Sequence, residues 1–377
     1  MRKINVLQLV EGFSFGGAEG KLLELVERLD KSKYNVTVCS LGLGGILQEK
    51  FEKIGVKVLV ISRKSKFDCA FIFKLIKLMR EEKIDILQTT LFFADFIGPI
   101  AAKLAGVRVT LAWETISAPE WLVKRRLIAY KIAMKFADKI ISVSEATKIW
   151  SVKKRGISPE KLVTIPYGVD LQKYNLNPAS EKRKELGVSS GTILFGTVAR
   201  LHKQKGHVYL IKAVKDVVKE IPNVKFVFIG DGELREELEE QVNKFKIADK
   251  FLFLGFRYDV DELLKTIDVF VLPSLYEGLP NVILEAMACG QPVIATSVDG
   301  SPEAIENNVT GILVPPRDPE SLKHAISHLA KNKNLRESMG KEGRHRVEKY
   351  FSLRGQLEKF ENMYDQFFLK KVVRTYN

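Results

Sequence analysis

Short apolar runs alternate with longer amphipathic segments along almost the whole chain. In the first half, the apolar runs predict strands of one sheet at Ile4–Val10, Val36–Ser40, Val58–Ile61, Ile84–Gln88, Val107–Trp113 and Lys139–Val143. The second half repeats the pattern, with strands predicted at Ile193–Val198, Lys225–Ile229, Phe251–Leu254, Val269–Leu272, Pro292–Thr296 and Gly311–Val314. Because strands that alternate with helices join through right-handed crossovers, each half predicts a parallel sheet covered by helices on both faces.

A polar stretch, residues 171–190, separates the two sets of strands and reads as a linker. At 377 residues the chain is long enough for two domains. We therefore expect an α/β protein of two doubly wound, Rossmann-like domains, 1–175 and 176–350, followed by a helical segment at 351–377. Ligands of such sheets bind beyond the carboxyl ends of the strands, so the two sheets are expected to face each other across a cleft.

The composition argues against a membrane-spanning or disulfide-linked protein. No uncharged apolar run reaches the roughly 18 residues of a membrane span, and the first strand follows Met-Arg-Lys directly, unlike a secretion signal. The three cysteines are scattered without metal-site spacing, and all five histidines lie in the second half. We therefore expect a cytoplasmic protein with reduced cysteines and without a histidine base in its first half.

Positive charge is concentrated in the first half. Residues 1–175 hold 30 Lys and Arg against 18 Asp and Glu, whereas residues 176–377 hold 30 against 28. An excess of this size indicates an acidic partner, and the charge alone leaves open anionic lipid, a phosphorylated acceptor and nucleic acid.

Two glutamates stand out in the second half. Glu277 precedes a helix predicted at residues 280–289, and Glu285 lies inside that helix, on the same face as Asn281. Pro280 suits the first helical position, because its missing N–H costs nothing there. These residues give the helix one face that is free to meet a ligand.

The start of this helix is a candidate binding site in its own right. Backbone N–H groups of Gly278, Leu279 and Asn281 are expected at its positive end. Such an end favours an anionic or polyhydroxylated group.

Two further turns carry candidate phosphate contacts. Arg200 and Lys205 follow the strand Ile193–Val198, and a guanidinium and an ammonium at that place can both reach a diphosphate. Gly16 and Gly17 follow the first strand, where paired glycines let backbone N–H groups approach a ligand. Taken alone, the two cations would be read as solvated loop charges, and the glycine turn is equally consistent with a purely structural role.

Several segments together carry a family resemblance. They are Gly196-Thr-Val-Ala-Arg200-Leu-His-Lys-Gln-Lys205-Gly206, the two glutamates eight residues apart, Pro292-Val-Ile-Ala-Thr296, Gly300-Ser-Pro-Glu303 and Gly311-Ile-Leu-Val-Pro-Pro316. This combination resembles the donor-binding half of a family 4 glycosyltransferase. The resemblance implies the GT-B fold and retaining, metal-independent transfer of a hexose from a nucleoside diphosphate, expected to be UDP. It also implies a glycan or lipid-linked acceptor, no resident cofactor, no nucleic-acid partner, and a last helix that crosses back to the first domain.

The resemblance also implies roles for the candidate residues. Glu285 would hold the ribose hydroxyls and Glu277 the donor sugar, because ionised carboxylates accept strong hydrogen bonds from hydroxyls. Arg200 and Lys205 would bind the diphosphate. Gly16 and Gly17 would contact phosphate, and the backbone of Gly255 would contact the nucleobase. Chemistry would rest on stabilising the charge that develops on the leaving diphosphate.

The acceptor side departs from the family pattern. Members often carry a histidine after the strand that here ends Leu111-Ala-Trp113-Glu114-Thr115, and none is present. Glu114 is the better candidate for binding an acceptor hydroxyl, since Trp113 can only donate. The departure also supports an alternative, a non-catalytic sugar-nucleotide or glycan-binding protein with an intact donor pocket.

A weaker alternative is an NADP-binding oxidoreductase. Gly42-Leu-Gly44-Gly-Ile-Leu47 follows a strand but lacks the third glycine of a dinucleotide fingerprint. Arg63, after the next strand, offers one cation for a phosphate. Nothing in the second half favours hydride transfer.

Two basic segments of the first half suggest docking on an anionic membrane. In Trp121–Lys135, Lys124, Lys131 and Lys135 are predicted to share one helix stripe, opposite Leu122, Ala129, Ala133 and Phe136. Arg63–Lys66 and the following Phe71–Lys77 offer a second basic surface. Several basic residues near an anionic surface support reversible docking, at roughly 1 kcal/mol each.

Overall fold

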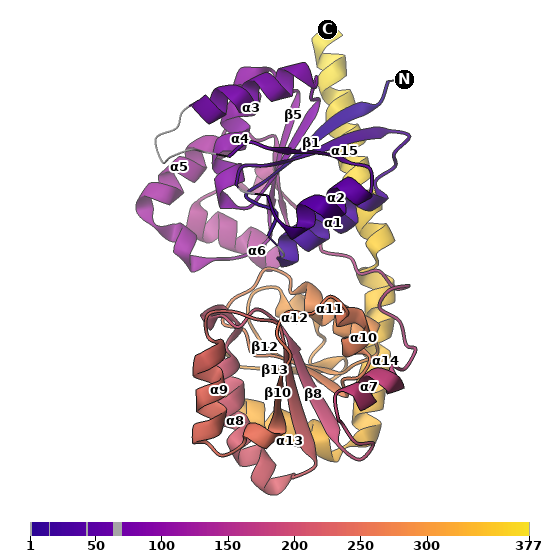
Figure 1. The fold of residues 1–377 in the computed structure, drawn as a ribbon. Coiled ribbons are helices and arrows are strands. Elements are labelled where there is room, and N and C mark those ends of the chain that lie inside the picture. The colour runs from indigo at the N-terminus through magenta and orange to yellow at the C-terminus, as the bar shows by residue number, and fades with distance from the viewer. Residues whose placement is uncertain (1, 15, 43, 63–69, 377) are drawn as a thin grey trace. The chain divides into compact units, whose positions relative to one another are not determined.

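The computed structural model describes residues 2–14, 16–42, 44–62 and 70–376 (Figure 1). Contacts divide the chain into a first unit, Met1–Tyr167 with Gln356–Asn377, and a second unit, Gly168–Gly355. The division lies between Tyr167 and Gly168, before the predicted boundary at 175. Val169 explains the difference, because it forms a β-bridge with Ser352 and its N–H donates to Phe351 at 2.8 Å.

Within its described residues, the first unit contains a parallel sheet with the strand order β3-β2-β1-β4-β5-β6-β7. Its strands are β1 Ile4–Val10, β2 Tyr34–Ser40, β3 Lys57–Val60, β4 Ile86–Thr90, β5 Val109–Glu114, β6 Lys139–Ser142 and β7 Leu162–Thr164. The sequence pattern missed β7, a three-residue edge strand that pairs with β6 alone.

The second unit contains a parallel sheet with the order β10-β9-β8-β11-β12-β13. Its strands are β8 Ile193–Val198, β9 Val224–Ile229, β10 Phe251–Phe253, β11 Val269–Leu272, β12 Val293–Thr296 and β13 Gly311–Val314. The predicted α/β class with two doubly wound parallel sheets is therefore confirmed. In both sheets the strand order reverses beside the first strand, which places β1 and β8 at the switch points where ligands of such sheets bind.

Two predicted strands begin too early, at Ile84 and Val107. In the structure the N–H of Ile84 donates to Met79 and that of Val107 to Ala102, at 2.9 and 3.0 Å. Both residues therefore close the end of the preceding helix, and pairing in the sheet starts two residues later, at Ile86 and Val109.

Helices cover both sheets. In the first unit they are α1 Gly17–Arg28, α2 Ile46–Lys53, α3 Ala70–Glu81, α4 Phe92–Ala105, α5 Lys124–Met134 and α6 Glu145–Trp150. In the second unit they are α7 Ser180–Glu185, α8 His207–Glu220, α9 Arg235–Lys244, α10 Val260–Leu264, α11 Asn281–Ala288, α12 Ser301–Ala304, α13 Pro319–Lys331 and α14 Lys333–Tyr350. A last helix, α15 Leu353–Tyr376, ends the chain.

The predicted linker, 171–190, is partly helical and belongs to the second unit. Arg183 of α7 donates to the carbonyl of Thr266 at 2.7 Å and pairs with Asp268 at 3.0 Å. These contacts tie the stretch to the sheet of the second unit, which a pattern of polar residues does not reveal.

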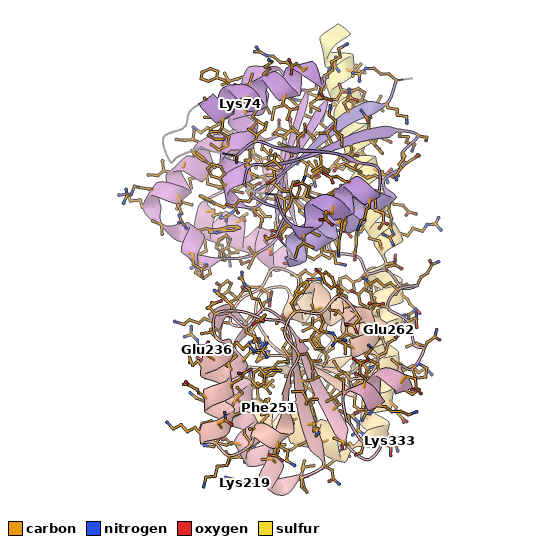
Figure 2. The ribbon with its side chains drawn as sticks, in the orientation of Figure 1. Lys74, Lys219, Glu236, Phe251, Glu262 and Lys333 are labelled. Atoms are coloured by element: carbon orange, nitrogen blue, oxygen red, sulfur yellow. The ribbon has the colours of Figure 1, made fainter. Side chains whose placement is uncertain are left out.

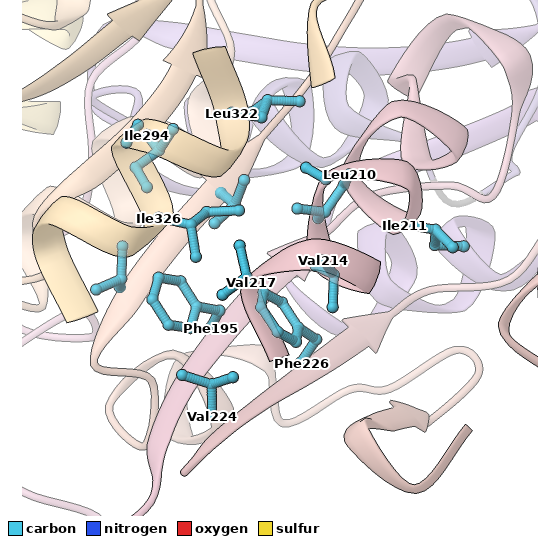
Figure 3. Packing of buried hydrophobic residues seen from close by; sticks show 14 of the residues in the cluster. Phe195, Leu210, Ile211, Val214, Val217, Val224, Phe226, Ile294, Leu322 and Ile326 are labelled. Atoms are coloured by element: carbon cyan, nitrogen blue, oxygen red, sulfur yellow. The ribbon is translucent and has the colours of Figure 1, made fainter. Parts of the chain in front are cut away.

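The core of the second unit shows why its strands read as continuous apolar runs. Phe195 and Phe226, from β8 and β9, stack with their ring centroids 5.1 Å apart. Leu210, Val214 and Val217 of α8 and Leu322 and Ile326 of α13 pack in the same cluster (Figure 3). Charged side chains such as Lys219, Glu236 and Lys333 lie on the outer helices, as Figure 2 shows. A sheet covered on both faces has little room for polar residues in its strands.

The last helix, from Gln356 onward, packs on the first unit. The hydroxyl of Tyr364 donates to Gln88 of β4 at 2.7 Å and accepts from Gln8 of β1 at 3.0 Å. The hydroxyl of Tyr34 donates to Asp365 at 2.6 Å. The buried contacts of Tyr364 and the part-buried contact of Tyr34 fix the register of the helix against the sheet, because an unpaired buried hydroxyl or amide is costly.

Candidate active site

The helix between the two glutamates is α11, Asn281–Ala288. Pro280 and Cys289 flank it instead of belonging to it, so the predicted helix of 280–289 is one residue too long at each end. Gly290 follows with a φ of 75°, the left-handed conformation expected of a residue just past a helix.

Glu285 lies inside α11 and is 5% exposed. Its Oε1 accepts a hydrogen bond from the side-chain amide of Asn281 at 2.9 Å. The structure thus brings Asn281 and Glu285 together on one face, as their spacing predicts. The bond orients the carboxylate through a neighbour one helical turn away.

Glu277 is also 5% exposed, and its surroundings are densely hydrogen-bonded. Its Oε1 accepts from Lys205 Nζ and from the hydroxyl of Ser274, both at 2.6 Å. Its backbone N–H donates to Asp299 Oδ2 at 2.6 Å. The carboxylate and the main chain of Glu277 are therefore both fixed in place.

The turn after β8 is locked to the loop that carries Glu277. The carbonyl of Gln204 accepts from the N–H of Leu275 at 2.7 Å, and the Gln204 side chain donates to the carbonyl of Tyr276 at 2.9 Å. Gly206 has a φ of 68°, and a Cβ on it would lie 2.0 Å from the carbonyl oxygen of Pro273. The glycine is required for this close approach, which places Lys205 beside Glu277.

Arg200, in contrast, lies on the surface at the end of β8. Among the residues that the structure describes, no hydrogen-bond or ion-pair partner is found for its guanidinium. The structure therefore joins Lys205 to Glu277 and shows no such contact for Arg200 among the described residues.

Gly255 lies in the loop that follows β10, the edge strand beside β9. Its carbonyl accepts from the N–H of Gly230 at 2.8 Å, and its φ of 66° is left-handed. This bridge connects the loops that follow β9 and β10. The contact of Gly255 with a nucleobase stays a prediction.

The paired glycines of the first unit stand at the start of α1. Gly17 is the first residue of the helix and Gly16 precedes it in extended conformation. A Cβ on Gly16 would lie 2.3 Å from a carboxylate oxygen of Glu19. The helix start that a phosphate contact needs is present, and the contact itself stays a prediction.

Glu114 is not placed to bind an acceptor. It is 1% exposed, and its carboxylate accepts hydrogen bonds from Tyr130, Ser151 and Arg155. Arg155 lies in turn over the rings of Trp121, Tyr130 and Trp150, with 4.3 to 5.0 Å between its guanidinium carbon and the ring centroids. The role expected for Glu114 is therefore corrected, because its carboxylate is buried and committed to an internal ion pair.

Trp113 is 0% exposed and packs between Tyr167 and Phe360, so it is a core residue.

The glycines behind the dinucleotide alternative also have a structural explanation. A Cβ on Gly42 or Gly45 would lie 2.5 Å from the carbonyl oxygens of Glu11 and Phe13, respectively. Both glycines allow the loop after β2 to pack against the loop after β1. Arg63 lies outside the described residues.

Sequence reasoning missed two residues of the site, Ser274 and Asp299. Ser274 follows β11 and is 0% exposed, and Asp299 follows β12 with a φ of 43°. Their only signal was a position shortly after a buried strand. Within the described residues, no group of three or more His, Cys, Asp or Glu side chains is arranged to hold a metal ion.

Comparison with known proteins decides the family. Residues 15–173 match the family model described as Glycosyltransferase Family 4, and residues 178–346 match that of Glycosyl transferases group 1. The chain is 32% identical over 307 residues to the UDP-Gal:alpha-D-GlcNAc-diphosphoundecaprenol alpha-1,3-galactosyltransferase of Escherichia coli. The matched residues cover 79% of each chain. The chain belongs to glycosyltransferase family 4.

Other relatives of this glycosyltransferase agree. The capsular polysaccharide biosynthesis glycosyltransferase CapM of Staphylococcus aureus is 30% identical over 80% of this chain and 81% of its own. The crystal structure of Anabaena HepE in complex with UDP-glucose has a TM-score of 0.88 and 24% identity, covering 96% of this chain and all of that one. The latter likeness supports the GT-B fold. The family match sets aside the oxidoreductase and the non-catalytic alternatives.

The basic helix of the first unit differs from its prediction. The helix α5 begins at Lys124 and ends at Met134, so Leu122 lies in the preceding 3-10 helix and Phe136 lies beyond the end. Tyr130, Ala133 and Met134 form its buried side, whereas Phe136 is 41% exposed. Among the described residues, no helix is both long and apolar enough to cross a bilayer.

Proposed function

We propose that this glycosyltransferase moves a hexose from UDP to a lipid-linked glycan acceptor, with retention of the anomeric configuration and without a metal ion. The observation that carries the proposal is the part-buried ion pair between Lys205 and Glu277, the cation proposed to bind the diphosphate and the carboxylate proposed to bind the sugar. The printed names of the relatives support the substrates: the Escherichia coli enzyme uses UDP-Gal and a diphosphoundecaprenol acceptor, and HepE binds UDP-glucose.

The donor would lie along the carboxyl ends of the second sheet. Glu285 would accept the ribose hydroxyls, and Glu277 those of the hexose. The diphosphate would lie between Lys205, Arg200 and the first N–H groups of α11, at the positive end of that helix. Gly255 would contact the nucleobase through its backbone, and the glycine turn at Gly16 and Gly17 would contact phosphate.

Catalysis would follow from charge stabilisation at the leaving group. As the bond between the anomeric carbon and the β-phosphate oxygen breaks, negative charge grows on that phosphate and the sugar becomes oxocarbenium-like. Lys205 and Arg200 stabilise this charge, and such groups contribute most when they are pre-positioned. The acceptor hydroxyl attacks from the same face, and its proton passes to the departing phosphate oxygen. Since Glu114 is committed elsewhere, the mechanism uses no protein base from the end of β5.

The first unit would dock on an anionic membrane to reach a lipid-linked acceptor. Its helix α5 exposes Lys124, Arg125 and Lys131, and Lys135, which directly follows the helix, is also exposed. Four apolar side chains are exposed beside them: Val123 at 54%, Ile128 at 51%, Ile132 at 49% and Phe136 at 41%. A helix that exposes both kinds of side chain suits the boundary between headgroups and acyl chains. The protein would then work at the inner face of the membrane.

A second helix of the first unit, α3, also exposes an apolar and a basic side chain, Phe73 and Lys74. Phe73 is 72% exposed and Lys74 is also exposed (Figure 2). The first part of the second basic segment, Arg63–Lys66, lies outside the described residues.

The test is a transfer assay with a polyprenyl diphosphate-linked sugar as acceptor and UDP-glucose, UDP-galactose and their N-acetyl forms as donors. We expect acceptor-dependent release of UDP with one donor preferred, an α-linked product by NMR, and full activity in the presence of EDTA. A β-linked product, or activity restored only by added Mg²⁺ or Mn²⁺, would contradict the mechanism.

A further inference from the structure

Asp299 has an unusual backbone conformation next to the donor site. It lies in the loop between β12 and α12 with a φ of 43°. Side-chain-bearing residues rarely adopt this left-handed conformation, and Asp and Asn do so more readily because their short polar side chains bond locally. A strained residue of this kind is a reason to look for a function.

The Asp299 side chain bonds to the main chain of the sugar-binding glutamate. Its Oδ2 accepts from the N–H of Glu277 at 2.6 Å, while the N–H of Gly300 donates to the carbonyl of Gly278 at 2.9 Å. These two bonds connect the loop after β12 to the loop after β11. The left-handed turn at Asp299 therefore sets where the Glu277 backbone lies.

The same contact brings the Asp299 carboxylate against the main chain of Glu277, close enough for the charge of the Glu277 side chain to act on it. Burial raises the pKa of the Asp299 carboxyl above its usual range, and the charge of Glu277 acts in the same direction. Lys205 balances Glu277 through their ion pair. If Lys205 binds the diphosphate of a donor, the Glu277 carboxylate loses this counter-charge while Asp299 stays close to it. Carboxylates accept hydrogen bonds from sugar hydroxyls, whereas a further carboxylate on the sugar would be repelled.

We propose that Asp299 is a positioning and specificity-determining residue: it holds Glu277 against the donor sugar, and together with Glu277 it selects a neutral hexose over a hexuronic acid. The inference rests on the proposed role of Glu277 in binding the donor sugar. Discrimination arises from an unfavourable interaction with the wrong donor as well as a favourable one with the right donor.

The test is calorimetric titration of the whole protein with UDP and with two matched pairs: UDP-glucose against UDP-glucuronic acid, and UDP-galactose against UDP-galacturonic acid. For the pair whose neutral member binds, we expect the natural protein to bind the uronic acid at least about tenfold more weakly, which corresponds to about 1.4 kcal/mol. Asp299→Asn keeps an acceptor oxygen and tolerates the turn, so the variant should still bind the neutral donor. It should reduce the ratio of the affinities for the neutral and the uronic donor. Asp299→Gly relaxes the backbone and removes the acceptor, so it should weaken the neutral donor by about tenfold and leave UDP unchanged.

Equal affinity for the neutral and uronic donors in the natural protein would overturn the proposed selection of a neutral hexose. An unchanged ratio of these two affinities in Asp299→Asn would overturn it as well. Equal weakening of UDP and the neutral donor in Asp299→Gly, with an unchanged thermal midpoint, would show that the loop does not act on the sugar. Ser297→Ala, at an exposed position of the same loop, is the matched control and should change no affinity. Failure of the natural protein to bind UDP or any UDP-sugar would instead defeat the proposed function.

Discussion

Lys205 Nζ lies 2.6 Å from Glu277 Oε1, and the two side chains are 19% and 7% exposed. The pair joins the expected phosphate end of the site to the expected sugar end. A diphosphate that recruits Lys205 must compete with Glu277, so binding of the phosphate and orientation of the sugar carboxylate are coupled.

Replacing either cation of the β8 turn should slow transfer. Lys205→Ala and Arg200→Ala each remove a positive charge that we propose stabilises the leaving diphosphate, and each should lower kcat by roughly a hundredfold or more. Lys203→Ala, an exposed lysine in the same turn, is the control and should keep normal turnover. Steady-state rates of UDP release provide the measurement, and an unchanged kcat in Arg200→Ala would exclude that residue from the site.

The two glutamates should separate binding of the nucleotide from binding of the sugar. Glu285→Gln should weaken UDP itself, since the ribose is part of UDP. Glu277→Gln should spare UDP and weaken the sugar nucleotide, by about tenfold for one charge-assisted bond. Calorimetric titration with UDP and the UDP-sugar checks the division. Equal losses for both ligands in both variants would rule it out.

Glu114 should matter for stability. Glu114→Gln leaves Arg155 buried without its counter-charge, and removing one partner of a buried pair costs about 3–5 kcal/mol. Replacing both residues, as Glu114→Leu with Arg155→Met, should cost less than either single change. Urea denaturation followed by circular dichroism measures the free energies of unfolding. If Glu114→Gln kept full stability and lost transfer, the acceptor role would have to be reinstated.

His207 should make the protein less stable in acid. Burial lowers the pKa of His207 to about 3, and the charge of Lys205 acts in the same direction. The unfolded chain therefore takes up a proton at His207 near its ordinary pKa of 6.5, while the folded chain does not. Stability from this residue is present above that pH and falls by about 1.4 kcal/mol per pH unit below it.

The matching variant is His207→Leu, which has no proton to take up. The difference in unfolding free energy between the natural protein and this variant should shrink or reverse between pH 6 and pH 4 by about that slope. Urea titrations at several pH values supply the data. Parallel pH profiles for the two proteins would count against a neutral buried His207.

Charge reversal on α5 should abolish membrane docking. The natural protein should sediment with vesicles that contain anionic lipid at low salt, less so at high salt, and not with neutral vesicles. Lys124→Glu, Arg125→Glu and Arg126→Glu together should prevent this. The matched control reverses Lys219, Lys333 and Lys341 of the second unit, and should still bind. If the triple α5 variant binds anionic vesicles as well as the natural protein does, a soluble acceptor would be favoured.

Much of the fold and part of the site follow from the sequence. Apolar runs located most strands to within two residues, and Asn281 and Glu285 meet because helical geometry brings residues four apart onto one face. Gly290 after α11, and the positions of Arg200 and Lys205 after β8, were predicted on the same basis. Where a helix or strand ends depends on local backbone chemistry. Each of these inferences depends on neighbours within a few positions along the chain.

The tertiary structure alone decided the contacts between distant segments. Lys205 and Glu277 are 72 positions apart, and Glu277 and Asp299 are 22 positions apart, yet the parallel order of β8, β11 and β12 brings their loops to one edge of the sheet. Glu114 shows the reverse case. Its position at the end of a strand favoured an acceptor site, but packing buries it beneath Tyr130, Ser151 and Arg155. Sequence determines which side chains follow a strand, whereas their exposure and partners depend on what the rest of the chain packs against them.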